Sequence, residues 1–247
     1  MEGSRDQAWA RTPPARVTRE LILRGVFGSI VAGYARCLVA GLDELERLGS
    51  GPAIFVANHS SHVDTPVLLL ALPAGRRRRT AVAAAADYFY ASRALAGAVS
   101  LSFGTVPLAR DGRGAGADAA RIGRLLDGGW SLVVFAEGTR SRDGRLGRMR
   151  SGAAVLAAAH GVPIVPVHIA GTREAMPIGR RWMVRPAGGE RFARHTISVT
   201  FGAPIDAADR VGTMARVREF MAGCGAELAV DPRDPDRAGA SHLASAR

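Results

Sequence analysis

The chain has no lysine. All 33 of its basic residues are arginine, against 22 acidic residues, and the net charge is +11 over 247 residues. Low lysine with abundant alanine, glycine and arginine is typical of a biased genome composition rather than of a chemistry. The surface must nevertheless be basic, which favours nucleic acid, an anionic membrane or a phosphorylated ligand as partner.

Other features that the sequence has little of narrow the choice of partner and cellular setting. The two cysteines, Cys37 and Cys224, match no metal or redox spacing, so a reduced cytosolic setting is expected. Aromatic residues make up 6% of the chain and are not interleaved with basic ones in a recognisable module, which argues against a nucleic-acid protein. The start, "MEGSRDQAWARTPPAR", carries charge but no apolar core of a secretory signal.

Between the two ends, short β-like runs alternate with helical ones, which predicts an α/β fold. We expect a single domain whose mixed, mostly parallel sheet is covered by helices on both faces. The candidate strands are Ala53–Ala57, Thr80–Ala84, Leu101–Val106, Ser131–Phe135, Ile164–Ile169 and Thr196–Phe201. The candidate helices are Pro66–Leu72, Asp118–Leu126, Ser151–His160 and Ala207–Met221. Pro163 and Pro166 indicate that the fifth strand is an edge strand or carries a bulge.

The first 48 residues are expected to lie outside that domain. Residues 1–16 resemble a flexible arm. From Thr18 to about Leu42, apolar residues recur at helical spacing and arginines interrupt them, so residues 17–48 are predicted to be an amphipathic helical segment. Its uncharged stretches are well short of the ~20 residues of a spanning helix. It either lies in a bilayer surface or packs on the core as an ordinary helix. The domain itself is expected over 49–225, followed by a disordered tail over 226–247.

The stretch "NHSSHVDT" (Asn58–Thr65) holds two histidines and an aspartate directly after an apolar run. His59 and Asp64 are five residues apart, roughly 140° around an ideal helix, so a tight turn must bring them together. In such a turn the carboxylate would fix one ring nitrogen of His59 and leave the other free to accept a proton. Three other interpretations stay open: Asp64 or Thr65 as a helix N-cap, His59 and His62 as metal ligands, and Ser60 or Ser61 as a nucleophile.

Three further segments carry polar groups at the ends of apolar runs. "FGTVPLAR" ends in Arg110, and "SLVVFAEGTR" runs from a buried strand into Glu137, Gly138, Thr139 and Arg140. Backbone N–H groups, a hydroxyl and a guanidinium in so few residues suit an oxyanion such as phosphate. Each segment by itself is equally typical of a solvated turn. The third, "GVPIVPVHIAGT", has no chemistry that its residues reveal.

In this order, the segments resemble the glycerolipid acyltransferase family of the lysophosphatidic acid acyltransferase type. The family's N-H-x4-D block matches Asn58 through Asp64, and its block ending in arginine matches Phe103 through Arg110. Its F-P-E-G-T-R-S block matches Phe135 through Ser141, and its V-P-I-x-P block matches Val162 through Pro166. Ala136 replaces the usual proline, and Leu108-Ala109 stand where acidic or aromatic residues are common.

The resemblance implies a general base, His59, oriented by Asp64, which transfers an acyl group without a covalent enzyme intermediate. Arg110, Glu137, Gly138, Thr139 and Arg140 would bind the acceptor. The implied partners are acyl-CoA or acyl carrier protein, a lysophospholipid and an anionic membrane surface, with no cofactor and no metal. The amphipathic segment and the arginine run Arg76–Arg79 would then contact the cytoplasmic face of the cell membrane.

The acceptor implied first is 1-acylglycerol 3-phosphate, with phosphatidic acid as product. The same chemistry on lyso-ornithine lipid, another lysophospholipid or a glycolipid is the nearest alternative. A catalytically inactive, membrane-bound scaffold is a further one, against which the intact His59 and Asp64 argue.

Overall fold

The computed structural model describes residues 6–85, 92–108, 115–188 and 192–228. Seven strands in these ranges form one sheet in the order β1-β7-β6-β2-β5-β3-β4. Neighbouring strands are parallel, except that β6 and β7 are antiparallel. The strands are β1 (Ala35–Ala40), β2 (Ile54–Ala57), β3 (Thr80–Ala85), β4 (Thr105–Leu108), β5 (Ser131–Phe135), β6 (Ile164–Ala170) and β7 (His195–Phe201). The predicted mixed, mostly parallel sheet is confirmed.

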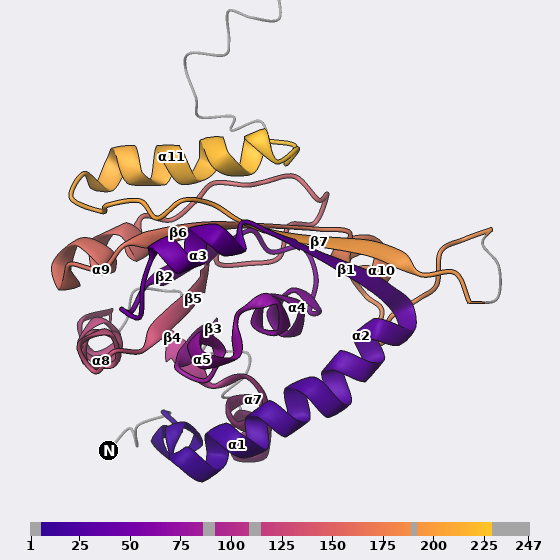
Figure 1. Cartoon of the computed structure of the whole chain (residues 1–247), viewed down its shortest axis with the longest axis horizontal. Coiled ribbons are helices and arrows are strands. Elements are labelled where there is room, and N and C mark those ends of the chain that lie inside the picture. Colours follow the sequence, from indigo (N-terminus) through magenta and orange to yellow (C-terminus); the bar gives the residue numbers. More distant parts are fainter. Residues whose placement is uncertain (1–5, 86–91, 109–114, 189–191, 229–247) are drawn as a thin grey trace, which may run out of the picture.

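Helices cover both faces of the sheet (Figure 1). All four residues of β2 are buried because successive side chains enter two different apolar clusters. Phe55 packs in the cluster beneath α4, and Ile54 packs in the cluster beneath α9 and α11. The helices after β1 are α3 (Leu42–Arg47), α4 (Asp64–Ala71), α5 (Ala74–Arg77), α7 (Arg93–Phe103), α8 (Ala115–Asp127), α9 (Gly152–His160), α10 (Thr172–Ala175) and α11 (Arg210–Gly223).

Two of the strand predictions are corrected. The expected strand Leu101–Val106 is half helix: α7 ends at Phe103, Gly104 takes a left-handed conformation (φ +67°), and β4 begins at Thr105. The strand β6, which contains Pro166 and directly follows Pro163, is an interior strand rather than an edge. Its ladder to β7 begins only at Val167, so Pro166 stands just before that ladder, where a missing N–H is tolerated.

The N-terminal residues are helical where an arm was expected. A 3₁₀ turn, η1 (Ala8–Arg11), and α1 (Pro13–Leu21) occupy residues 8–21, and Ala10 and Ala15 are buried. Pro13 and Pro14 suit a helix start because the first-turn N–H groups have no intrahelical acceptor. At the other end, only residues 226–228 of the expected tail 226–247 are described. Among them, Leu228 forms an isolated parallel bridge with Leu146, and residues 229–247 lie outside the described ranges.

The amphipathic segment is helical only as far as Tyr34. After α1, one stretch of π-helix, η2 (Ile22–Phe27), leads into α2 (Gly28–Tyr34), and the three form one rod (Figure 1). The next residues form β1, because Ala35 to Ala40 pair in parallel with β7. Residues 35–40 therefore belong to the same sheet as the rest, and the predicted boundary between 48 and 49 does not separate two structural units.

Two buried neighbours fasten α1 to the domain. Arg19 donates from Nε to the carbonyl of Leu101 (3.1 Å) and also contacts the carbonyl of Ala10. Burial, followed by the charges of nearby arginines, lowers the pKa of Arg19 to about 10. Glu20 pairs with Arg77, whose Nη1 also donates to the carbonyl of Leu72 (2.9 Å) at the end of α4. The rod is therefore an integral part of the fold.

The arginine run Arg76–Arg79 is largely used inside the molecule. Arg77 is buried in its pair with Glu20. Arg76 donates to the carbonyls of Gly49 and Gly51, and Arg79 donates to that of Gly128. Three of these four guanidinium groups are thus engaged within the molecule, where the resemblance implied that the run contacts a membrane.

The outer side of the rod is apolar. Val17, Leu21 and Val26 are 63%, 69% and 51% exposed, while Leu23 and Val31 on the inner side are buried. The exposed residues follow one another at i+4 and then i+5, and the wider π-helical turn of η2 accommodates the second spacing. Within the described residues, no helix is both long and apolar enough to cross a bilayer. The inner face of the segment packs on the core, as one interpretation predicted, and contact of the exposed apolar face with a bilayer stays a prediction.

Replacement of Arg77 by methionine should destabilise the domain by about 3 kcal/mol or more, because it leaves the Glu20 carboxylate buried and unpaired. Pairing with Arg77 lowers the pKa of Glu20, so the stabilisation is present above the unfolded pKa and is lost as the pH falls through the folded one. Urea unfolding at pH 7 measures the loss. Arg47→Met breaks the exposed Arg47–Glu44 pair and serves as the control, with an expected change within about 1 kcal/mol. Equal losses of unfolding free energy in the two variants would contradict the conclusion that the Glu20–Arg77 pair fastens α1 to the domain.

Candidate active site

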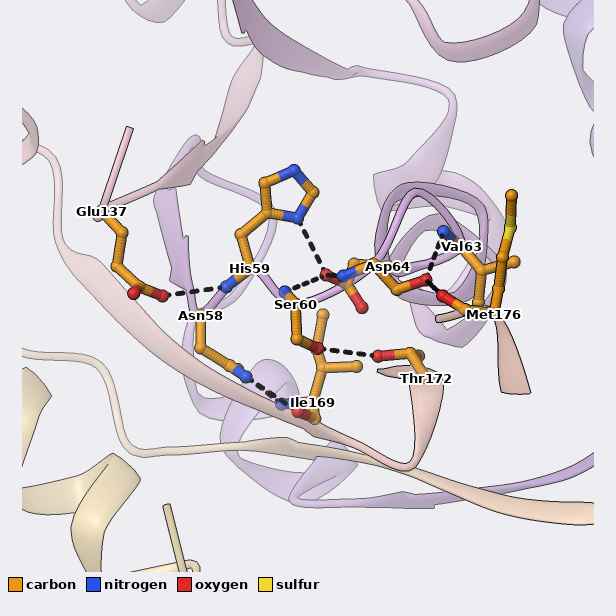
Figure 2. Close-up of polar contacts among 10 residues, drawn as sticks. Asn58, His59, Ser60, Val63, Asp64, Glu137, Ile169, Thr172 and Met176 are labelled. Atoms are coloured by element: carbon orange, nitrogen blue, oxygen red, sulfur yellow. Dashed lines mark hydrogen bonds and ion pairs between the residues drawn. The ribbon is translucent and has the colours of Figure 1, made fainter. Parts of the chain in front are cut away.

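The turn between β2 and α4 brings His59 and Asp64 together. His59 Nδ1 lies 2.8 Å from Asp64 Oδ2, and the carboxylate, which can only accept, fixes the proton on Nδ1. The His59 side chain is 17% exposed, whereas Asp64 is completely buried. Figure 2 shows the second ring nitrogen pointing away from Asp64. This is the geometry of a base whose tautomer is set by a buried acid.

The Asp64 carboxylate faces the turn rather than the helix that it begins. The backbone N–H groups of Ser60 and Ser61 donate to the same Oδ2 atom, at 2.7 and 2.8 Å. A helix N-cap would instead accept from amides further along α4. The carboxylate thus organises the loop around His59, and the N-cap interpretation does not describe its contacts.

Neighbouring strands hold the histidine from two sides. Its ring stacks on Phe135 at the end of β5, with ring centroids 4.1 Å apart and planes 22° from parallel. Asn58 clamps the end of β2 to β6: its side-chain amide donates to the carbonyl of Ile169 and accepts from the Ile169 N–H, both at 2.8 Å. The sequence contained Asn58 in its motif but gave no role for it, because the partner is a backbone more than a hundred residues away.

The two serines of the turn are structural. Ser60 shares a hydrogen bond with Thr172 (3.1 Å), and the Ser61 hydroxyl donates to the carbonyl of Met176 (2.9 Å). Both residues are buried. Their hydroxyls fasten the turn to α10 and the residue after it, so neither has the exposed position that a nucleophile requires.

Glu137 supports the turn from the loop after β5. Its carboxylate accepts from the backbone N–H of His59 at 3.2 Å (Figure 2). It also accepts from the backbone N–H of Gly147 at 2.9 Å. Burial raises the pKa of Glu137, and the two backbone hydrogen bonds oppose that rise. The sequence predicted a ligand-binding role for this residue. Its contacts are those of a positioning residue, which the sequence could not reveal because both donors are backbone groups.

Three other predicted binding residues, Gly138, Thr139 and Arg140, come directly after Glu137 in the chain. Gly138 has φ +72°, and an added Cβ would lie 2.9 Å from the Nε of Arg150, so the position requires glycine. Gly138 and Thr139 line a cavity together with His59. Arg140 lies close enough to His62 that its charge, after burial, lowers the pKa of that histidine. Arg110 lies outside the described residues.

A metal site has no support among the described residues. No group of three or more His, Cys, Asp or Glu side chains there is arranged to hold a metal ion. His62 is exposed and lines the same cavity as His59, whereas His59 also turns its Nδ1 towards Asp64. The two histidines of the H-x-x-H pair therefore do different things.

His59 opens into a cavity of about 1240 Å³. The cavity forms where strands diverge: β3 and β5 pair only over Thr80–Val82, after which β3 continues with β4 and β5 with β2. Alanines 83–85 of β3 and the end of β5 line the gap, and Ile122 and Leu156 line its far side. The lining of this apolar channel thus includes residues packed with both apolar clusters, on the two faces of the sheet, together with His59.

Arginines border this cavity near His59. Arg148, Arg150 and Arg181 are lining residues, and all three side chains are exposed. None of the three was among the predicted site residues, although Arg148 and Arg150 follow the E-G-T-R block within ten residues. An apolar channel with a basic rim suits an anionic amphiphile.

Comparisons with known proteins agree with this geometry. Residues 36–170, more than half of the chain, match the family model described as Acyltransferase. A chloroplastic 1-acyl-sn-glycerol-3-phosphate acyltransferase of Brassica napus is 34% identical over 148 residues, which cover 57% of this chain and 39% of that protein. The corresponding chloroplastic protein LPAT1 of Arabidopsis thaliana is 37% identical over 142 residues, 56% of this chain and 38% of that one. The chain thus spans about two fifths of the length of these relatives.

A solved structure shares the fold. The crystal structure of the 1-acyl-sn-glycerophosphate acyltransferase PlsC from Thermotoga maritima superposes with a TM-score of 0.62 at 23% identity, over 92% of this chain and 86% of that one. The matched segment 36–170 contains the His59–Asp64 turn, Glu137 to Arg140 and the strands that hold them. Because the family model matches more than half of the chain, the chain belongs to the Acyltransferase family.

Proposed function

We propose that the protein is an O-acyltransferase that moves a fatty acyl group from acyl-CoA or acyl carrier protein to the free hydroxyl of a lysophospholipid. The acceptor favoured here is 1-acylglycerol 3-phosphate, which gives phosphatidic acid. One observation carries the proposal: a histidine fixed by a buried aspartate stands at the end of a large apolar cavity with a basic rim.

In the proposed reaction, Nε2 of His59 removes the proton from the acceptor hydroxyl. The oxygen attacks the carbonyl carbon of the thioester, a C–O bond forms, and the C–S bond breaks. The departing thiolate recovers the proton from the imidazolium. Asp64, as an anion, stabilises that imidazolium while the charge exists. No enzyme nucleophile is required, in agreement with the structural roles of Ser60 and Ser61.

The cavity suits the hydrocarbon part of the substrates, and its rim suits their phosphates. An acyl chain is stabilised by about 0.8 kcal/mol for each methylene that leaves water. Arg140, which lies near His62, is proposed to bind the acceptor phosphate, together with Thr139 and Gly138. Glu137 is proposed to act one step removed, by holding the backbone of His59 in place.

The N-terminal rod is proposed to be the part of the protein that contacts a membrane. The exposed stripe Val17, Leu21 and Val26 is proposed to lie in the surface of an anionic bilayer, at the cytoplasmic face of the cell membrane. In that position the rod would hold the cavity close to the layer in which lysolipids are dissolved. Phe27, Ile30 and Val31 of the same rod line the cavity, which supports this arrangement.

His59→Ala should lower kcat by about 10²- to 10⁴-fold without unfolding the protein, because a positioned general base contributes that much. Thiol release from acyl-CoA and a thermal melt measure the two quantities. The chain offers a matched control: His160 lies 2.8 Å from Asp127 in a similar pair at the surface, away from the cavity. His160→Ala should be fully active. Activity of H59A within about threefold of the unmodified enzyme would disprove the catalytic pair.

Asp64→Asn should lower kcat by roughly 10²-fold or more, since an amide does not stabilise imidazolium and presents an N–H where three donors converge. Steady-state kinetics and circular dichroism are compared with Asp127→Asn, the same change in the surface pair. A purely structural aspartate would instead yield a variant whose remaining folded fraction turns over at the normal rate.

Arg140→Lys should raise the KM for lysophosphatidic acid more than tenfold and leave that for acyl-CoA nearly unchanged, because lysine does not reproduce a bidentate guanidinium contact. Inorganic phosphate and glycerol 3-phosphate should compete with the acceptor. Arg142→Lys, two residues further on and exposed, is the control. A silent R140K variant without anion competition would transfer the proposal to an acceptor that lacks a phosphate monoester.

A further inference from the structure

The loop between α10 and β7 lies alongside α2. Its described residues, 177–188 and 192–194, are called the α10–β7 loop here. Trp182 Nε1 donates to the hydroxyl of Tyr34 (3.2 Å), and Arg194 Nη1 donates to the carbonyl of Ala32 (3.3 Å). The Arg185 guanidinium lies 5.1 Å from the centroid of the Tyr34 ring. The loop and the end of the N-terminal rod therefore form one continuous surface.

This surface combines exposed apolar groups with arginines. Ile178, Trp182 and Phe192 are 42%, 55% and 73% exposed. Arg180, Arg181, Arg185 and Arg194 are exposed in the same loop, and its described residues include no aspartate or glutamate. Arg185 also lies 5.8 Å from the Phe192 ring centroid. Over residues 177–194 of the sequence, five arginines stand against one acidic residue, Glu190. Aromatic rings beside an excess of arginines are typical of the interface between lipid headgroups and acyl chains.

The same loop borders the cavity. Arg181, Trp182 and Met183 line it on one side, and Phe27 and Ile30 of the rod line it on the other. An amphiphile that moves from a bilayer to His59 would therefore pass between the α10–β7 loop and the rod. This position explains why apolar side chains would stay exposed there in the absence of lipid.

We propose that the α10–β7 loop is a second bilayer-contact surface, which docks the cavity on an anionic lipid surface together with the N-terminal rod. The inference rests on the proposed function, since it supplies the route by which that function receives its lysolipid. The partner is a membrane because the loop combines a net positive charge with exposed apolar side chains beside an apolar cavity. The internally bonded run Arg76–Arg79 has no such position.

The test compares three proteins on vesicles and in detergent. The loop variant is Ile178→Ser, Arg180→Gln and Phe192→Ser; none of these residues lines the cavity. The control variant is Arg210→Gln and Val211→Ser on α11, where Val211 is 83% exposed on the other side of the sheet. Sedimentation with phosphatidylglycerol-containing and pure phosphatidylcholine vesicles measures binding. Turnover is measured on lysophosphatidic acid dispersed in detergent and embedded in vesicles.

Binding of the loop variant to anionic vesicles should fall more than tenfold, since one arginine near such a surface alone accounts for about fivefold. Its turnover in detergent should be unchanged, and its turnover on embedded substrate should fall in parallel with binding. The control variant should behave like the unmodified protein.

Equal vesicle binding by all three proteins would overturn the inference and leave the rod as the bilayer contact. The inference would also be overturned if the unmodified protein sedimented as a dimer and the loop variant as a monomer that still binds vesicles. That result would assign the surface to contact with a second copy of the chain. If the unmodified protein turns over no lysolipid in detergent, the proposed function fails, while the vesicle comparison still decides the role of the loop.

Discussion

One carboxylate oxygen, Oδ2 of Asp64, is the point on which the site depends. The Asp64 carboxylate is completely buried, and the His59 ring and the N–H groups of Ser60 and Ser61 converge on this single oxygen. The first turn of α4 adds its own positive end. Because two donors are backbone groups, the charge shapes the loop that carries the histidine. Catalytic geometry and local folding are therefore the same set of contacts.

The loop is equally constrained from outside. Asn58 ties it to β6, and Glu137 ties it to the loop after β5. These partners meet because β2, β5 and β6 are adjacent parallel strands whose carboxyl ends share one edge of the sheet. Segments about eighty and one hundred and ten residues apart thereby act on one histidine. The divergence of β3 from β5 beside them opens the sheet and gives that histidine its apolar cavity.

The sequence predicted the parts of this arrangement that depend on local pattern. The apolar runs that became β2, β5 and β6 and the turn that joins His59 to Asp64 were visible because hydrophobic spacing and a helix-starting proline mark them. Roles that depend on backbone partners were not visible, such as those of Glu137 and Asn58. Residues 35–40 were predicted as helix because their apolar pattern does not exclude one; the pairing with β7, more than 150 residues away, made them a strand.

The arginines show a second limit on what can be predicted from the sequence. A guanidinium with five donors can neutralise a carboxylate, cap a helix or meet a lipid, and composition counts these uses alike. In the run Arg76–Arg79, carbonyls and a buried glutamate take up three of the four side chains, because the α5 turn sets them among loop ends. Arginines 180, 181, 185 and 194 also fall close together in the sequence, but they lie exposed on one loop beside the rod and the cavity. The density of arginine along the chain therefore does not tell a run that is bonded within the molecule from one that is exposed; the contacts that the fold gives each side chain do.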